Sequence, residues 1–195
     1  MNPFITVVSG LPRSGTSLMM QMLAAGGLPI LTDGIRVPDE NNPHGYFEFE
    51  PVKRPGGAAE WIGYARGKAV KVIYALLAEL PASSNYRVIM MRRSLPEVIS
   101  SQRAMLVRSG RRGADVSPAE LAAIFESELA RVDEWLSRQP NFATLSVRYT
   151  DCILNPVTAA EEVAGFVEVG QPLKFLDRVQ MAAAVEPSLY RHRNR

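Results

Sequence analysis

The stretch GLPRSGTS, residues 10–17, has the residue types of a loop that binds an anion. Gly10 and Gly15 fit the phosphate-binding pattern G-x-x-x-x-G-K-[ST], but Thr16 stands where that pattern has lysine. The apolar run before the loop and the apolar helix pattern 17–25 after it would place backbone N–H groups around an anion. Thr16 and Ser17 add hydroxyl donors, and Arg13 restores a positive charge. The simpler alternative is a strand–turn–helix junction that Thr16 or Ser17 caps without a ligand.

An arginine and a serine eight residues apart form a second candidate cluster, in VIMMRRSLPEVISSQRAML, residues 88–106. A strand that ends just before Arg93 would deliver this side chain to the ligand-binding edge of a sheet, with Ser101 early in the following helix. A guanidinium and a hydroxyl so placed suit a dianionic phosphate. Arg92 and Ser100 have the same spacing, so the register is open by one residue. The simpler alternative is a surface arginine and an unrelated helix serine.

The elements that must position these residues alternate between strands and helices. Short apolar runs bounded by turn formers predict strands at 4–9, 69–73, 87–91 and 143–148, with a weaker one at 28–31. Three of them are nearly continuous apolar runs, as expected of strands covered on both faces of a parallel sheet. The order implies an α/β fold, a three-layer αβα sandwich with a central, mainly parallel sheet. Ligands of such sheets bind beyond the carboxyl ends of the strands.

The helix signals are clearest in the second half of the chain. Ser117 to Glu120 is a capping box with proline at the first helical position, so a helix should start near residue 118. Its apolar stripe runs through Leu121, Ile124, Phe125, Leu129, Val132, Trp135 and Leu136. Further helices are predicted at 96–109 and from Pro156 onward. The stretches 32–67 and 108–116 lack periodicity and are expected to be long functional loops or a lid.

Composition restricts the class of protein. The 195 residues suit a single domain over 1–195, and 47% apolar residues with a net charge of +2 argue against nucleic acid as the main partner. The single cysteine, Cys152, fits a reducing compartment and is expected to be a small packed residue. No window reaches the length of a membrane span or a signal-peptide core. We therefore expect a soluble, cytoplasmic protein that binds no metal.

The loop and the Arg–Ser pair together resemble sulfotransferases that use 3'-phosphoadenosine 5'-phosphosulfate (PAPS), which have a P-loop NTPase-like fold. Pro12-Arg13-Ser14-Gly15-Thr16-Ser17 is similar to that family's 5'-phosphosulfate loop, which lacks the usual lysine. The resemblance implies that Arg13 contacts the sulfuryl group and bridging oxygen, and that Gly15, Thr16 and Ser17 hold the 5'-phosphate. It likewise implies that Arg93 and Ser101 grip the 3'-phosphate.

Softer similarity extends over most of the chain, in NPHGYFEFEP, GKAVKVIYALLAELP, VRYTDCILNP and EPSLYRHR. It implies one sulfotransferase-like domain that transfers the sulfuryl group to a hydroxyl or amine of a small-molecule, carbohydrate or lipid acceptor, without metal. A nucleotide kinase with a degenerate loop and a non-catalytic nucleotide-binding protein are the alternatives. A homodimer is an option that the sequence leaves open.

The general base is expected in GYFEFE, residues 45–50, or just before it. Several bacterial relatives place a glutamate in this region, which makes Glu48 the preferred base and His44 the second candidate. Aromatic neighbours would raise the pKa of the Glu48 carboxyl, as a base working near neutrality needs. The alternation of Tyr46, Glu48 and Glu50 with two phenylalanines equally describes an exposed strand.

Other charged residues are weaker candidates, because solvated surface positions explain most of them. Lys68 and Lys71 flank the second long strand, and one of them is expected near the cofactor edge. Arg111 and Arg112 lie in the loop 108–116, where they could contact an anionic acceptor or the cofactor. His192 belongs to a basic tail whose arginines could reach the 3'-phosphate.

Overall fold

Five parallel strands form the centre of the structure, a computed structural model that describes residues 4–40, 42–54, 56–113, 115–170 and 175–190. The strand order is β2-β3-β1-β4-β5, and every neighbouring pair is parallel. The strands are β1 (Ile5–Gly10), β2 (Ile30–Leu31), β3 (Ala69–Lys71), β4 (Tyr86–Arg92) and β5 (Phe142–Arg148). All five predicted strands are thus present, with ends that differ by one or two residues.

The register of the sheet brings the candidate residues to one edge. All six residues of the central strand β1 are buried, as its nearly continuous apolar run predicts. Val8 of β1 lies opposite Lys71 of β3, and Gly10 lies opposite Met91 of β4. The carboxyl ends of the three middle strands are therefore adjacent, and the segments that follow them share one side of the molecule.

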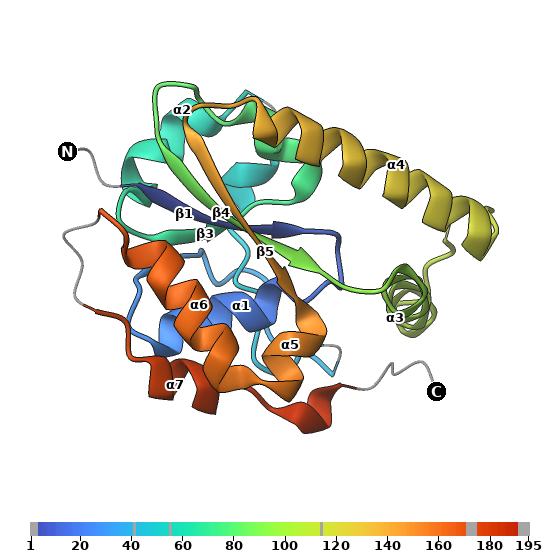
Figure 1. Cartoon of the computed structure of the whole chain (residues 1–195). Helices are drawn as coiled ribbons and strands as arrows, with labels where there is room; N and C mark the ends of the chain where they lie inside the picture. Colours follow the sequence, from blue (N-terminus) through green and yellow to red (C-terminus); the bar gives the residue numbers. More distant parts are fainter. Residues whose placement is uncertain (1–3, 41, 55, 114, 171–174, 191–195) are drawn as a thin grey trace.

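Helices cover both faces of the sheet, so the predicted three-layer α/β architecture is confirmed (Figure 1). One face carries α1 (Thr16–Ala25), α5 (Tyr149–Leu154), α6 (Pro156–Glu168) and α7 (Arg178–Ala183). The other face carries α2 (Ala58–Trp61), α4 (Pro118–Ser137) and the 3-10 segments Glu50–Lys53, Ile62–Ala65 and Tyr74–Glu79. Helix α3 (Leu95–Arg108) follows β4 and lies beyond the carboxyl end of the sheet (Figure 1).

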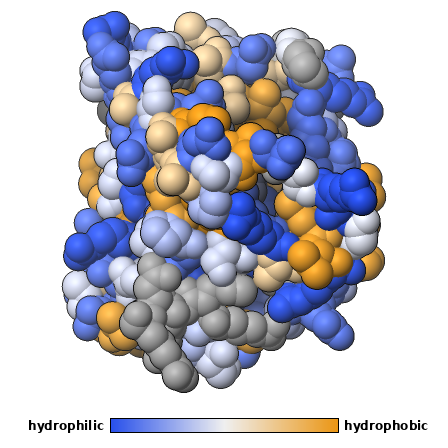
Figure 2. All heavy atoms as spheres, turned by 90° about the vertical axis from the view of Figure 1, so that its right-hand side faces the viewer, coloured by the Kyte–Doolittle hydropathy of each residue, from blue (hydrophilic) through white to orange (hydrophobic). Residues whose placement is uncertain are grey.

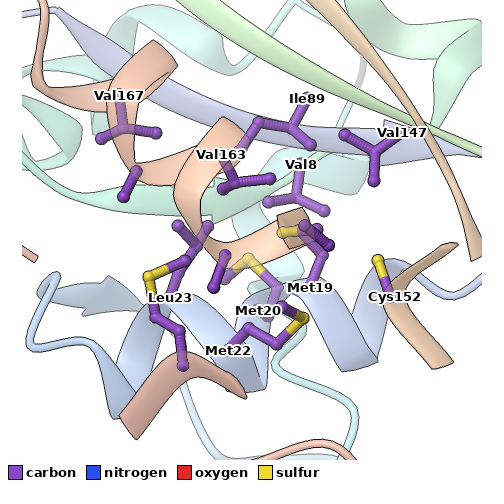
Figure 3. Packing of buried hydrophobic residues seen from close by; sticks show 14 of the residues in the cluster. Val8, Met19, Met20, Met22, Leu23, Ile89, Val147, Cys152, Val163 and Val167 are labelled. Carbon is purple, nitrogen blue, oxygen red and sulfur yellow. The ribbon is translucent and has the colours of Figure 1, made fainter. Parts of the chain in front are cut away.

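The core beneath α1 is rich in methionine (Figure 3). Met19, Met20 and Met22 are fully buried and pack between the strands and α6. Cys152 of α5 is buried in the same cluster, as expected of a free cysteine, and burial raises the pKa of its thiol to about 12. The thiol therefore stays protonated and unreactive at neutral pH.

Helix boundaries follow the local signals in the sequence. The Ser117–Glu120 capping box is present at the start of α4, and Pro156 opens α6. The stretch 32–67 is only partly a loop, because residues 50–65 form three short helical segments whose apolar side chains join the core. No helix within the described ranges is long and apolar enough to cross a membrane.

Candidate functional site

A cavity of about 390 Å³ lies at the carboxyl ends of the strands, where both predicted clusters meet. Its wall includes the loop after β1, Lys71 at the end of β3, Arg93 after β4 and Tyr149 after β5. A volume in this range is typical of small-molecule sites. The predicted ligand-binding edge of the sheet therefore carries a cavity lined by both clusters.

The loop after β1 takes a path that needs its two glycines. Gly10 and Gly15 have φ of 146° and 105°, which favour glycine. A Cβ on Gly10 would lie 2.7 Å from the Met91 carbonyl oxygen, and one on Gly15 would lie 2.5 Å from Cδ2 of Tyr149. Arg13 itself has φ of 77°, a sparsely populated conformation that clusters at functional sites. The loop thus holds Arg13 and the start of α1 against the cavity.

Most predicted loop residues line the cavity. Pro12, Arg13, Gly15, Thr16 and Ser17 do so. Ser14 does not, because its side chain is 1% exposed and points into the protein, while its N–H donates to the Leu11 carbonyl. The predicted ligand contact of Ser14 therefore has no support in the geometry.

The two predicted basic clusters touch each other. Arg13 Nε donates to Ser101 Oγ at 3.0 Å, although the two residues are 88 positions apart in the chain. Arg93 Nη1 donates to the Arg13 carbonyl oxygen at 3.3 Å. Burial lowers the pKa of the Arg13 guanidinium, and the nearby Arg93 charge adds to this effect. Two guanidinium groups packed this closely create a field that attracts an anion.

The structure also separates the two possible registers of the Arg–Ser pair. Arg93 and Ser101 both line the cavity, and Ser101 is 2% exposed. Arg92 instead forms an ion pair with Asp133 of α4, and Ser100 is exposed. The pair that faces the cavity is therefore Arg93 with Ser101.

Three residues that the sequence analysis did not single out hold Arg93 in place. Glu97, in the first turn of α3, accepts from Arg93 Nε at 2.8 Å, and both side chains are nearly buried. The guanidinium lies 4.4 Å from the ring centre of Tyr149 and 5.4 Å from that of Tyr190. Tyr190 in turn donates its hydroxyl hydrogen to Glu97 at 2.7 Å. An acid four residues after the arginine, at the start of the predicted helix, was the available signal for Glu97.

Glu48 lines the cavity, but its environment is opposite to the expected one. Its carboxylate lies 2.8 Å from Arg36 and from Lys53, and 3.9 Å from Lys71. Burial alone would raise the pKa of Glu48, but the bond from Lys53 and the charges of Lys71 and Arg36 lower it. The predicted raised pKa is therefore wrong, because cations and not aromatic rings dominate the surroundings.

The backbone around Glu48 is not the exposed strand that alternation allowed. Residues 46–49 have no strand partner within the described chain, and Tyr46 is 5% exposed. Phe47 has φ of 50°, rare for a bulky residue. This turn directs the Tyr46 carbonyl toward Lys71 Nζ, which donates to it, and it leaves the Glu48 carboxylate on the cavity wall.

Lys71 lies beside the start of α1. Its Nζ is 3.3 Å from Ser17 Oγ, and its side chain is 11% exposed. Burial lowers the pKa of Lys71 to about 8. The sequence pointed to Lys71 because it is a lysine at the carboxyl end of a predicted buried strand. Lys68, the alternative, does not line the cavity.

His44 also lines the cavity, next to Glu186 from the segment after α7. Its Nε2 is 3.0 Å from Glu186 Oε1, and both residues line the cavity. Arg111 and Arg112 are exposed and do not line it. His192 and the arginines of the basic tail lie outside the described residues. Within the described ranges, no group of three or more His, Cys, Asp or Glu side chains could hold a metal ion.

Comparison with solved structures places the fold in a known class. The chain is similar to the sulfotransferase domain from the curacin biosynthetic pathway, with a TM-score of 0.55, 18% identity, and 96% of this chain and 89% of that chain covered. It is also similar to the sulfotransferase domain from the Synechococcus PCC 7002 olefin synthase, with a TM-score of 0.50, 15% identity and coverage of 94% and 88%. No family profile and no curated protein matches the chain. The fold is therefore sulfotransferase-like.

Proposed function

We propose that the protein is a PAPS-dependent sulfotransferase that transfers the sulfuryl group to a hydroxyl or amine of a small-molecule, carbohydrate or lipid acceptor. The observation that carries the proposal is the contact between the two predicted clusters. Arg13 of the loop bonds to Ser101 of α3, and Arg93 bonds back to the loop, on the wall of one cavity. A carrier with phosphate groups on the 3' and 5' carbons of one ribose matches two anion-binding clusters that touch each other. The sulfotransferase-like fold agrees with this assignment.

The residues divide into two groups according to the part of the donor that they would bind. The N–H groups of Gly15, Thr16 and Ser17, with the hydroxyls of Thr16 and Ser17, would hold the 5'-phosphosulfate, since they line the cavity at the start of α1. Arg93 and Ser101 would hold the 3'-phosphate, and Glu97 and Tyr149 fix the direction of the Arg93 guanidinium. When bound, PAPS supplies the sulfuryl group. These residues orient it and exclude water from it.

The transfer step requires charge stabilisation more than covalent chemistry from the protein. Arg13, which lines the cavity, would stabilise the bridging oxygen as it gains charge. Lys71, beside Ser17, brings a second positive charge to the same end of the cavity. A base must also remove the acceptor proton, and both predicted candidates, Glu48 and His44, line the cavity. Glu48 is ionised at neutral pH, but its lowered pKa makes it a weak base.

We further propose that the protein is cytoplasmic, as its one buried cysteine fits a reducing compartment. It would act on a small-molecule acceptor without metal and without nucleic acid, and its small net charge agrees with the last point. A homodimer remains an option of the same proposal.

Calorimetric titration with 3'-phosphoadenosine 5'-phosphate (PAP) and with ATP, each with and without Mg²⁺, tests this function. We expect PAP to bind without metal and more tightly than ATP. Arg93→Ala should weaken PAP binding by about 2 to 5 kcal/mol, or at least about 30-fold, because it removes a charged contact to a phosphate. Arg92→Ala is the matched control, since Arg92 pairs with Asp133 outside the cavity. A preference for Mg²⁺ with ATP, or equal effects of the two substitutions, would reject the proposal.

A further inference from the structure

The segment after α7 returns to the cavity and is anchored on both sides. Gln21 of α1 donates to the Ala184 carbonyl oxygen at 2.9 Å, and Val185 is 8% exposed in the core. At the other end, the Tyr190 hydroxyl bonds to Glu97 beside Arg93. Glu186 lies between these anchors and lines the cavity. Its carboxylate therefore has a fixed backbone support next to the site.

Glu186 faces one nitrogen of His44, and the cavity provides access to the ring. Nε2 of His44 is 3.0 Å from Glu186 Oε1, and the imidazole is 34% exposed. With Nε2 against a carboxylate, the neutral ring carries its hydrogen on Nε2 and keeps the lone pair on Nδ1. A carboxylate in this position also holds the orientation of the ring.

We propose that His44 accepts the proton of the sulfuryl acceptor and that Glu186 is its positioning residue. This inference rests on the proposed function. We prefer His44 to Glu48 because the Glu48 carboxylate is already paired with Arg36 and Lys53, each at 2.8 Å. His44 has one acidic neighbour and an accessible ring, the arrangement that a general base requires.

The step balances without any further reactant. Nδ1 of His44 takes the proton from the acceptor hydroxyl, and the oxygen electron pair forms the new O–S bond. The bond between sulfur and the 5'-phosphate oxygen breaks, and its electron pair leaves with PAP. The imidazolium, opposite the Glu186 carboxylate, then returns its proton to solvent.

The contact between the two residues can be tested without any ligand. The chain has two histidines, so the His44 ring signals in NMR spectra are identified by their loss in His44→Ala. We expect Glu186→Ala to shift these signals and Glu60→Ala to leave them unchanged, since Glu60 is exposed and does not line the cavity. Unchanged His44 signals in Glu186→Ala would overturn the inference. Exposed ion pairs contribute little stability, so these variants should fold.

The role in proton transfer is tested by sulfate release from PAPS with water as the acceptor, alongside PAP binding. His44→Ala should slow release about 100-fold, within the range of general bases, and added imidazole should restore part of the rate. Glu186→Ala and Glu186→Gln should slow it at least about tenfold, with partial recovery in Glu186→Asp, because orientation and charge both matter. PAP affinity should stay within about twofold of wild type in all four.

The outcomes separate this inference from the proposed function. Wild-type rates in Glu186→Ala or His44→Ala, or no sulfate release by a wild type that binds PAP, would overturn the roles of His44 and Glu186 alone. A wild type that does not bind PAP would overturn the proposed function and this inference with it.

Discussion

Replacing Lys71 with methionine should stabilise the protein while it weakens donor binding. The Lys71 side chain is 11% exposed, and burial lowers its pKa from 10.5 to about 8. This fall corresponds to about 3 kcal/mol of folding free energy that is lost by keeping the ammonium charged at neutral pH. The substitution removes the hydrogen bonds from Lys71 Nζ to Ser17 Oγ and to the Tyr46 carbonyl, each of which contributes about 1 kcal/mol. The expected net gain is about 1 kcal/mol at pH 7, a rise in Tm of about 2 to 4 °C.

The effect has a definite pH dependence. Between about pH 8 and pH 10.5 the unfolded chain keeps the Lys71 proton that the folded protein has released, so the stability of the wild type rises with pH. The advantage of Lys71→Met is therefore full below pH 8 and reverses toward pH 10.5, where the charge penalty is gone and only the two lost bonds count. At pH 7 the same substitution should weaken PAPS binding at least about tenfold, since it removes a buried cation from the donor site.

Urea unfolding at pH 7 and pH 10, with calorimetric titration of PAPS at pH 7, measures both effects. Lys68→Met is the control, because Lys68 does not line the cavity. A Lys71→Met protein that is less stable than the wild type at pH 7, or that binds PAPS equally well, would refute the reasoning from burial and charge.

Two further substitutions test the packing of α6 on the sheet and the loop of the site. Arg87→Ala should lower the free energy of unfolding by about 2 to 4 kcal/mol in urea titrations, because Arg87 is 6% exposed and donates to two carbonyls at the end of α6; a loss under about 1 kcal/mol would contradict this. Gly15→Ala should destabilise by about 1 to 3 kcal/mol and weaken PAP binding, since its Cβ would meet the Tyr149 ring. Gly27→Ala is the control for backbone strain, because Gly27 also has positive φ but a Cβ there would meet nothing. Equal losses of PAP binding in the two variants would refute the role of the Tyr149 contact.

The fold was largely predictable because its signals are local. Continuous apolar runs mark strands that are covered on both faces, and the Ser117 capping box marks the start of α4. The order of the strands was not predictable in this way, because it depends on which segments pair across the sheet. The short helices α5 and α7 were missed, since six residues give no clear helical period.

The candidate site was predictable only where a motif is contiguous. The loop and the Arg93–Ser101 pair were found from spacing. The Arg13–Ser101 bond joins residues 88 positions apart, and the Tyr190–Glu97 bond joins residues 93 apart. No local pattern encodes such contacts. The predicted pKa of Glu48 was wrong for the same reason, because Lys71 approaches the carboxylate from a strand 23 positions further along the chain.

The methionine-rich core beneath α1 has a consequence for how the loop at its start can respond to an anion. Unbranched thioether side chains change shape at little energetic cost, unlike the β-branched residues that fill the strands. A small shift of α1 would be met by new rotamers of Met19, Met20 and Met22 and would open no void against α6. The packing beneath α1 is therefore deformable, while the strands that lead to Lys71 and Arg93 are not.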